Sequence, residues 1–287
     1  MCPLIVFGFG YRIVMHRYDE TQVDYSKYLG PRWRENKFQG KRVSTVVANH
    51  ISFIEVLLWM SQMTPPAFTP ASFVKKFPVG DHYCRALQSI YIDRISSTEE
   101  LDRQVADVAK RQELIERDDL EWGPLLIFAE GSVTNGKNLS RFRRGAFAAG
   151  LPVKPVFHRY YWKNVSPEYS TLKGLDLSLI MISEFAMNQV HGHELPTFVP
   201  NEYLYTEYAK TLPGHEKMQK WEIYAHAVED LIRSQGGFGK NEQPLREKIS
   251  FQEFIWGLKE EITVNGKTFY WPPRGQTAAT TESKKHS

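Results

Sequence analysis

The chain has 287 residues and a mass of 33.3 kDa, which is enough for one large α/β domain or two small ones. Its hydrophobic fraction of 42% and charged fraction of 24% are those of folded soluble domains, so the composition excludes a disordered chain, a collagen and a coiled coil. The net charge is only +3, which gives no reason to expect nucleic acid as a partner.

The most apolar segment near the first residue is PLIVFGFGYRIVM, residues 3–15. A helix needs roughly 20 consecutive apolar residues to cross a bilayer, and this segment is shorter and is interrupted by Arg12. Its basic residues follow the apolar run, whereas a secretory signal carries them in front. Two interpretations stay open for residues 1–24: a short apolar membrane-associating segment, or a buried helix or strand.

The first strong pair of elements begins at residue 41. Residues 41–49, KRVSTVVAN, contain a β-branched run without a helical period, which predicts a buried strand. Residues 52–63 predict a helix, and the S-x-x-E spacing of Ser52 and Glu55 marks its start. The predicted strand therefore leads almost directly into the predicted helix.

Strands and helices continue to alternate after this pair. Further strands are predicted at residues 73–74, 87–92, 124–129, 153–157, 175–185 and 189–198, and further helices at residues 97–117 and 216–233. This alternation predicts an α/β fold with a mixed, mostly parallel sheet flanked by helices, in a domain of residues 25–234. Residues 235–287 are expected to form a C-terminal extension with a polar tail.

Four polar residues lie where the first strand meets its helix: Asn49, His50, Ser52 and Glu55. Residues at the carboxyl ends of strands line the ligand crevice of α/β sheets, so His50 is placed to act on a substrate. A carboxylate five positions later can accept a hydrogen bond from one ring nitrogen and leave the other basic, as in a catalytic dyad. Taken alone, this window favours a simpler alternative, in which Glu55 caps the helix and His50 is a polar turn residue.

A second group, Glu130, Gly131 and Ser132, follows the most apolar predicted strand. Its place at the carboxyl end of a buried strand suits contacts with a substrate. The group is not a nucleophile elbow, because the glycines that flank the serine in G-x-S-x-G are missing, and it lacks the Walker A pattern. Alone, it is a common turn between a strand and a helix.

Basic residues also gather near predicted strand ends: Arg94 closes LQSIYIDR, and Arg141, Arg143 and Arg144 follow the glycine turn. The forked guanidinium group matches two oxygens of a phosphate at once. These residues therefore suit a phosphate dianion. An equally good interpretation is that they form a solvated charged surface without a ligand.

A histidine pair, His191 and His193, forms an H-G-H motif. No third and fourth ligand follow along the chain at zinc-finger or zincin spacing. We therefore expect no metal site from the sequence.

Four blocks, in this order, resemble the glycerolipid acyltransferases: NHISFIEVLL, LQSIYIDR, LLIFAEGSVTNGKNLSRFRRGAF and LPVKPV. That family includes 1-acylglycerol-3-phosphate acyltransferase and the lysophospholipid acyltransferases. The long third block and ELPTFVPNEY are most similar to the lysophosphatidylcholine acyltransferase branch, and the resemblance covers about residues 25–233. Four ordered blocks are far more specific than any one of them, so they favour the catalytic interpretation of His50.

The resemblance implies transfer of a fatty acyl group from acyl-CoA to the free hydroxyl of a lysophospholipid or acylglycerol phosphate at a membrane surface. No cofactor, metal or covalent enzyme intermediate is expected. His50 would be the general base and Glu55 the acid that orients it. Substrate contacts would come from Asn49, Ser52, Arg94, Glu130, Gly131, Ser132 and Pro155. Of these, Arg94 and Glu130 with Gly131 would position the phosphate-bearing glycerol, and the block around Pro155 would support the acyl-donor pocket.

Two positions depart from the family pattern. The first block usually reads H-x-x-x-x-D, whereas this chain has Glu55, and the third usually reads F-P-E-G, whereas this chain has Ala129. An acid that is one methylene longer must fold back to keep a hydrogen bond with His50. A second hypothesis therefore stays open: a catalytically silent, acyltransferase-like lipid-binding or structural subunit of a membrane protein complex.

The last residues carry a weak address signal. Lys284 and Lys285 match a dilysine retrieval signal of the endoplasmic reticulum, although two lysines in a polar tail arise easily by chance. The endoplasmic reticulum membrane and the mitochondrial membrane both stay open as locations.

Overall fold

The structure is a computed structural model that describes residues 7–62, 64–93, 96–117, 122–168, 170–184, 187–264 and 266–270. The α-helices are α2 (Ser26–Leu29), α3 (Ile54–Met60), α4 (Pro78–Ala86), α5 (Thr98–Glu116), α6 (Gly174–Ser183), α7 (Lys220–Gly236) and α8 (Leu245–Ile255). The strands are β1 (Tyr11–Arg17), β2 (Thr45–Ala48), β3 (Ala67–Phe68), β4 (Leu125–Phe128), β5 (Asn138–Ser140), β6 (Val153–Tyr161), β7 (Asn188–Glu194), β8 (Gly239–Asn241), β9 (Glu261–Val264) and β10 (Lys267–Tyr270). Short helical turns are η1 (Trp33–Glu35), η2 (Ser72–Lys76), η3 (Arg144–Ala146), the π-helical η4 (Leu204–Tyr208) and η5 (His215–Lys217).

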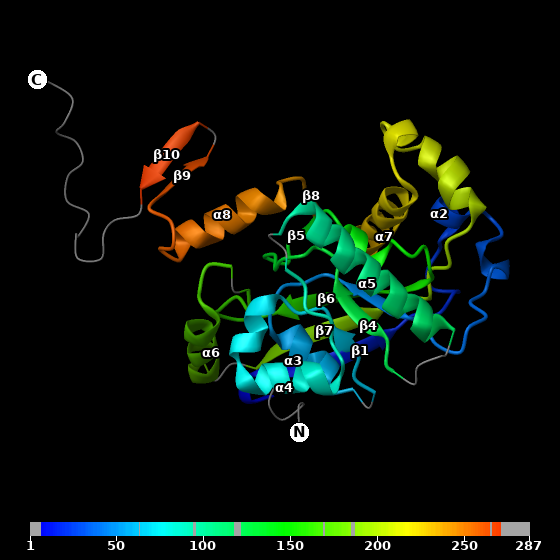
Figure 1. The fold of residues 1–287 in the computed structure, drawn as a ribbon. Coiled ribbons are helices and arrows are strands. Elements are labelled where there is room, and N and C mark those ends of the chain that lie inside the picture. The colour runs from blue at the N-terminus through cyan, green and yellow to red at the C-terminus, as the bar shows by residue number, and fades with distance from the viewer. Residues whose placement is uncertain are drawn as a thin grey trace, which may run out of the picture.

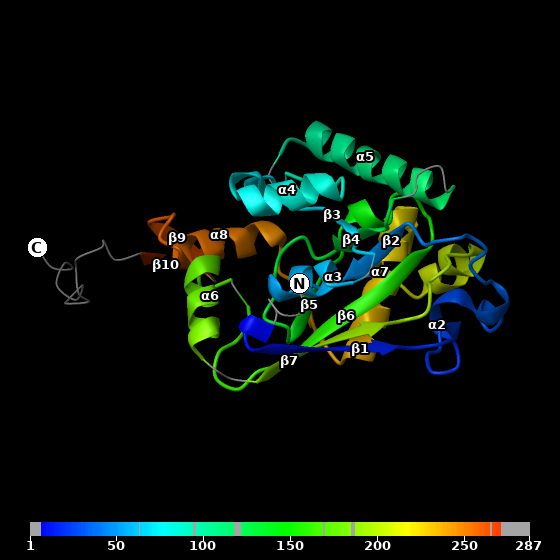
Figure 2. The ribbon, with the colours of Figure 1, turned by 90° about the horizontal axis from the view of Figure 1, so that it is seen from below.

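The main sheet has six strands in the order β1-β7-β6-β2-β4-β3 (Figures 1 and 2). Only β6 and β7 pair antiparallel within it, and all its other neighbours are parallel, which confirms the predicted mixed, mostly parallel α/β fold. Thr45 of β2 is opposite Leu125 of β4 and Val153 of β6. Because β2 is central, all four of its residues are buried, which explains its continuous apolar sequence.

Successive residues of β2 belong to two different hydrophobic clusters on the two faces of the sheet. Val46 belongs to the cluster that contains Ile54 of α3. Val47 belongs to the cluster that contains Val108 of α5 and Val228 of α7. Because side chains alternate along a strand, the sheet is covered by helices on both faces.

The predicted helix starts and stops are largely confirmed. The Ser97 hydroxyl accepts a hydrogen bond from the backbone N–H of Glu100 at 3.2 Å, at the start of α5. Helix α7 ends at Gly237, whose φ of +61° is a left-handed conformation that glycine adopts without steric cost.

Two predicted strands are wrong, and a third, residues 87–92, is extended only at its end, where Ile92 forms a parallel bridge with Ala71. Residues 73–74 lie in the 3₁₀ turn η2, and residues 175–185 coincide with helix α6 over its described part. In residues 87–92, Gln88 has a φ of +54° and the N–H of Ser89 bonds to the carbonyl of Cys84, so the start of this segment closes α4 instead of forming a strand. Short apolar runs do not distinguish strand from helix by pattern alone, which accounts for these errors.

The apolar segment near the first residue is in part an edge strand. Residues Tyr11–Arg17 form β1, which pairs parallel with β7, and the Tyr11 side chain is buried. This part matches the buried-strand interpretation, whereas a membrane-associating role is not confirmed, and residues 1–6 lie outside the described residues. Among the described helices, none combines the length and the apolar character that a bilayer crossing requires.

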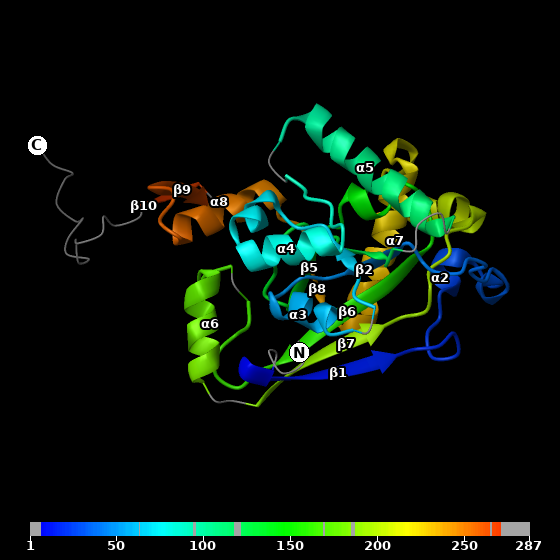
Figure 3. The same ribbon diagram turned by 60° about the horizontal axis from the view of Figure 1, so that its bottom comes forward.

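The predicted C-terminal extension continues from α7 without a break. Its β8 pairs parallel with β5, α8 follows, and β9 and β10 form an antiparallel pair. In Figures 1, 2 and 3, α4, α6 and α8 lie toward one end of the molecule and α2 toward the opposite end. Residues from 271 onward, with the predicted dilysine signal, lie outside the described residues.

Candidate active site

His50 and Glu55 form a buried hydrogen-bonded pair between β2 and α3. The His50 Nδ1 atom lies 2.8 Å from Glu55 Oε2, and both side chains are at least nine-tenths buried. The chain brings them together because β2 ends at Ala48 and α3 begins at Ile54, which places Glu55 in the first helical turn. The structure thus brings the two predicted catalytic residues together.

The Glu55 carboxylate folds back over the start of its own helix. Its Oε1 accepts hydrogen bonds from the backbone N–H groups of Ile51 at 3.1 Å and Ser52 at 3.0 Å. The same carboxylate therefore caps α3 and holds His50, so the capping contact and the histidine–acid pair occur together, and the catalytic role of the pair stays a prediction. This folding back accommodates the extra methylene of Glu55, so the hydrogen bond with His50 is kept although glutamate stands where the family usually has aspartate.

The pairing sets the tautomer of the His50 ring. An ionised carboxylate only accepts hydrogen bonds, so His50 donates through Nδ1–H and the lone pair of the neutral ring is on Nε2. The ring of Phe128, the last residue of β4, stacks on the His50 ring with centroids 4.0 Å apart and an interplanar angle of 10°. The ring plane and the basic nitrogen are thus both fixed, as general-base catalysis requires.

Glu130 is fully buried and joins the loop after β2 to strand β5. Its Oε1 accepts from the backbone N–H of His50 at 2.9 Å, and its Oε2 accepts from that of Ser140 at 2.8 Å. Burial raises the pKa of Glu130 to about 8, although these N–H groups favour the ionised form. In this structure Glu130 therefore positions the backbone of His50, and its predicted contact with substrate stays a prediction.

Replacing Glu130 with glutamine tests this bridging role. A glutamine oxygen accepts one of the two N–H groups and its NH₂ opposes the other, so we expect Glu130→Gln to lower the free energy of unfolding by about 1–3 kcal/mol at pH 5. Because the folded pKa is raised to about 8, the stabilisation by the bound proton is complete below the unfolded pKa and is lost as the pH rises through about 8. The gap in melting temperature between the two proteins should narrow from pH 5 to pH 9, and parallel curves would contradict the assignment.

Asn49 connects the end of β2 to β6. Its side-chain Oδ1 accepts from the N–H of His158 at 2.7 Å, and its Nδ2 donates to the His158 carbonyl at 3.1 Å. The His158 ring, in turn, accepts from Trp59 Nε1 at 3.1 Å, and burial lowers its pKa. Sequence reasoning missed His158, the sixth residue of β6, whose only local signal is its position within this largely buried strand.

The other predicted contact residues lie on several different elements. Gly131 and Ser132 follow Glu130 directly, and Gly131 has a left-handed φ of +71°. Ser52 lies in the loop before α3, where its hydroxyl accepts from the N–H of Ile54 at 3.3 Å. Pro155 lies inside β6, opposite Val47 of β2. Arg94 lies outside the described residues.

A cavity of about 470 Å³ reaches Phe128 and Gly131, next to the dyad. Its apolar lining includes Leu101, Val105 and Val108 of α5. The three predicted phosphate-binding arginines, Arg141, Arg143 and Arg144, also line it. Two of them form ion pairs, Arg141 with Glu222 and Arg144 with Asp102, and within the described part of the chain Arg143 forms none. An amphipathic ligand fits this combination of apolar wall and basic rim.

Part of the chain is similar in sequence to known acyltransferases. Residues 34–159 match the Acyltransferase family model. The chain is 26% identical over 218 residues to lysophospholipid acyltransferase LPEAT1 of Arabidopsis thaliana, covering 76% of this chain and 50% of that protein. It is 31% identical over 177 residues to LPEAT2 of the same plant, covering 61% of this chain and 31% of that protein. The chain thus spans half the length of the first relative and about a third of the second.

A structural likeness is more distant. The crystal structure of the 1-acyl-sn-glycerophosphate acyltransferase PlsC from Thermotoga maritima has a TM-score of 0.45 and 14% identity, over 82% of this chain and 78% of that one. That likeness is too distant to carry weight. The family model, in contrast, spans β2, α3, β4 and both halves of the dyad. The match to the Acyltransferase family model and the similarity to lysophospholipid acyltransferases confirm the resemblance of this chain to the glycerolipid acyltransferases.

Proposed function

We propose that this protein transfers a fatty acyl chain from acyl-CoA to the free hydroxyl of a lysophospholipid or acylglycerol phosphate. The observation that carries the proposal is the 2.8 Å hydrogen bond from His50 Nδ1 to the buried carboxylate of Glu55, beside the cavity that reaches Phe128. Relatives named lysophospholipid acyltransferases support the acceptor class.

His50 would act as the general base. Its Nε2 takes the proton of the acceptor hydroxyl while that oxygen forms a bond to the thioester carbonyl carbon. The carbon–sulfur bond then breaks, and the imidazolium returns the proton to the sulfur of the departing CoA. Glu55 stabilises the imidazolium that forms between these events, and no net proton is consumed.

The cavity supports an amphipathic substrate on chemical grounds. The apolar side chains of α5 suit a fatty acyl chain, and Arg143 at the rim carries a guanidinium that no described carboxylate pairs. A phosphate group of the lysolipid or of CoA is the anion such a fork binds best. The resemblance also implies that Arg94 positions the phosphate-bearing glycerol and that the block around Pro155 supports the acyl-donor pocket. Both roles stay predictions.

A lipid acceptor requires access to a membrane surface, and one end of the molecule carries exposed apolar side chains. On α6, Leu175 is 73% exposed, Leu179 60% and Ile182 51%. Phe73, Phe77 and Val79 are exposed on η2 and α4, next to the exposed Lys75 and Lys76. Helices α4 and α6 lie toward the same end in all three ribbon views (Figures 1, 2 and 3). We infer that this end rests on the bilayer, where apolar residues enter the interface and lysines meet anionic lipids.

Replacing Leu179 with glutamate tests the contact with the membrane. Removing one Leu side chain from an apolar environment costs about 1.5–3 kcal/mol, so we expect Leu179→Glu to weaken binding to lipid vesicles by roughly tenfold or more. Vesicle sedimentation measures this, with Gln39→Glu as a control that adds the same charge at an exposed position elsewhere. Equal sedimentation of the two variants would show that α6 does not touch the bilayer.

The proposed reaction itself is tested with the full chain, radiolabelled acyl-CoA and a panel of lysophospholipids and acylglycerol phosphates. We expect a diacyl product and one free CoA per product formed. Free fatty acid in place of the diacyl product would identify a thioesterase. A folded protein that turns over no acceptor would overturn the proposal in favour of a silent, acyltransferase-like subunit.

A further inference from the structure

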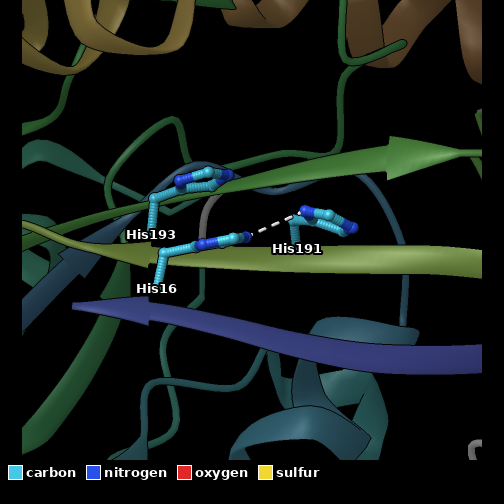
Figure 4. A group of neighbouring side chains, drawn as sticks. All are labelled: His16, His191 and His193. Carbon is cyan, nitrogen blue, oxygen red and sulfur yellow. Dashed lines mark hydrogen bonds between the residues drawn. The ribbon is translucent and has the colours of Figure 1, made fainter.

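Three histidines gather on the two neighbouring strands β1 and β7 (Figure 4). His16 lies on β1, and His191 and His193 lie on β7. The parallel register places His16 opposite His193, and alternate residues of a strand share a face, so His191 lies on the same side. The third member was missed from the sequence because His16 is 175 residues away from His191 and approaches only through strand pairing.

The ring nitrogens of the cluster are close enough to share an ion. One nitrogen from each ring lies within 4.8 Å of the others, and His16 Nε2 is 3.0 Å from His191 Nδ1. Zinc binds imidazole nitrogens at ~2.0–2.1 Å, which places two nitrogens of a tetrahedral ion ~3.4 Å apart. The rings of His16 and His193 are stacked with centroids 4.5 Å apart, so binding requires these two rings to tilt toward one ion.

Each histidine of β7 has a neighbouring polar side chain within hydrogen-bond distance of one of its ring nitrogens. Gln189 Oε1 lies 2.8 Å from His191 Nε2, and the Tyr18 hydroxyl lies 2.9 Å from His193 Nδ1. An amide oxygen accepts, so His191 donates through Nε2 and keeps the lone pair on Nδ1, toward His16. Metal-bound histidines are typically oriented by such a contact on the second nitrogen.

The His193 Nε2 atom gives an independent indication. It is buried and has no hydrogen-bond partner among the described residues. Buried polar atoms are nearly always paired, so an unpaired ring nitrogen beside two further imidazoles needs an explanation. An ion bound between the three rings would satisfy it.

We propose that His16, His191 and His193 bind a zinc ion, with water as the fourth ligand. Three imidazoles without a carboxylate suit a borderline-soft ion such as zinc better than magnesium or calcium, which prefer oxygen. The basic side chains Arg12 and Arg159 act electrostatically on His191 and His193, so they oppose a bound cation and lower its affinity. The ion would link the edge strand β1 to β7 and takes no part in the chemistry at His50.

The experiment uses the full chain after treatment with a chelator. Titration with zinc is expected to show one saturable site per chain, and cobalt in its place is expected to give the visible absorption of a four-coordinate ion. His16→Gln should weaken zinc binding by at least 100-fold, whereas His82→Ala, which removes an exposed histidine on α4, should leave it unchanged.

Three results would overturn the site. They are the absence of saturable zinc binding, the spectrum of a six-coordinate cobalt ion, and equal affinity of the two variants. The cobalt spectrum of the unmutated chain tests for a four-coordinate site even if the His16→Gln variant does not fold. Acyl transfer is expected to proceed in the chelator-treated chain, so failure of the zinc site is distinguishable from failure of the proposed reaction.

Discussion

His50→Ala is expected to lower kcat for acyl transfer by about 10²–10⁴-fold, which is the usual contribution of a general base. Without the imidazole, nothing at that position takes the proton of the acceptor hydroxyl. The residual rate would come from holding thioester and hydroxyl together in the cavity. Steady-state kinetics with acyl-CoA and the best lysolipid of the panel measure this, and KM should change far less than kcat.

The fold should survive this substitution. The Glu55 carboxylate keeps its hydrogen bonds from the backbone N–H groups of Ile51 and Ser52, so the start of α3 remains capped. The matched control is His215→Ala, which removes a histidine from η5 and should leave kcat unchanged. A fully active His50→Ala protein would show that another group takes the proton.

Glu55→Gln is expected to lower kcat by a similar factor, because it changes which nitrogen of the His50 ring carries the proton. The backbone N–H groups of Ile51 and Ser52 need an oxygen, so the glutamine would turn its NH₂ toward His50. An NH₂ donor requires a lone pair on Nδ1, which moves the ring proton to Nε2 and removes the base. We therefore expect a loss of about 10²–10⁴-fold in kcat.

Glu55→Asp separates the two roles of this side chain. The aspartate is one methylene shorter and keeps the charge, so it should recover part of the activity that glutamine loses. The pH dependence of kcat, together with the melting temperatures, distinguishes a changed tautomer from a loosened helix. If Glu55→Gln kept the kcat of the unmutated protein, Glu55 would be a helix cap alone.

The part of the site that lies close together in the chain could be predicted from the sequence. His50 and Glu55 are five residues apart, and the strand before them and the helix after them carry clear patterns, so their meeting follows from local structure. The bridge from Glu130 to the backbone of His50 spans 80 residues and was not predictable, because it depends on β4 pairing with β2. The stacking of Phe128 on His50 depends on the same pairing.

The wrong strand prediction at residues 175–185 and the unpredicted pairing of β1 with β7 have a common physical origin. The segment GLDLSLIMIS of α6 is apolar all round, with Leu177 and Met181 buried and Leu175 and Leu179 exposed, so it has no helical period to recognise. Its helical character depends on packing of one face against the domain. Likewise, nothing near Tyr11 indicates that β1 pairs with β7, which is distant in the chain.

The double use of the Glu55 carboxylate couples catalysis to local folding. Fraying of the first turn of α3 would withdraw the acid from His50 at the same instant that it releases the Ser52 amide. Exchange of that amide proton with deuterium would therefore count the fraction of molecules that are momentarily inactive. Substitutions that speed this exchange would lower turnover by the added fraction of molecules in which the turn is open, even when they touch neither substrate.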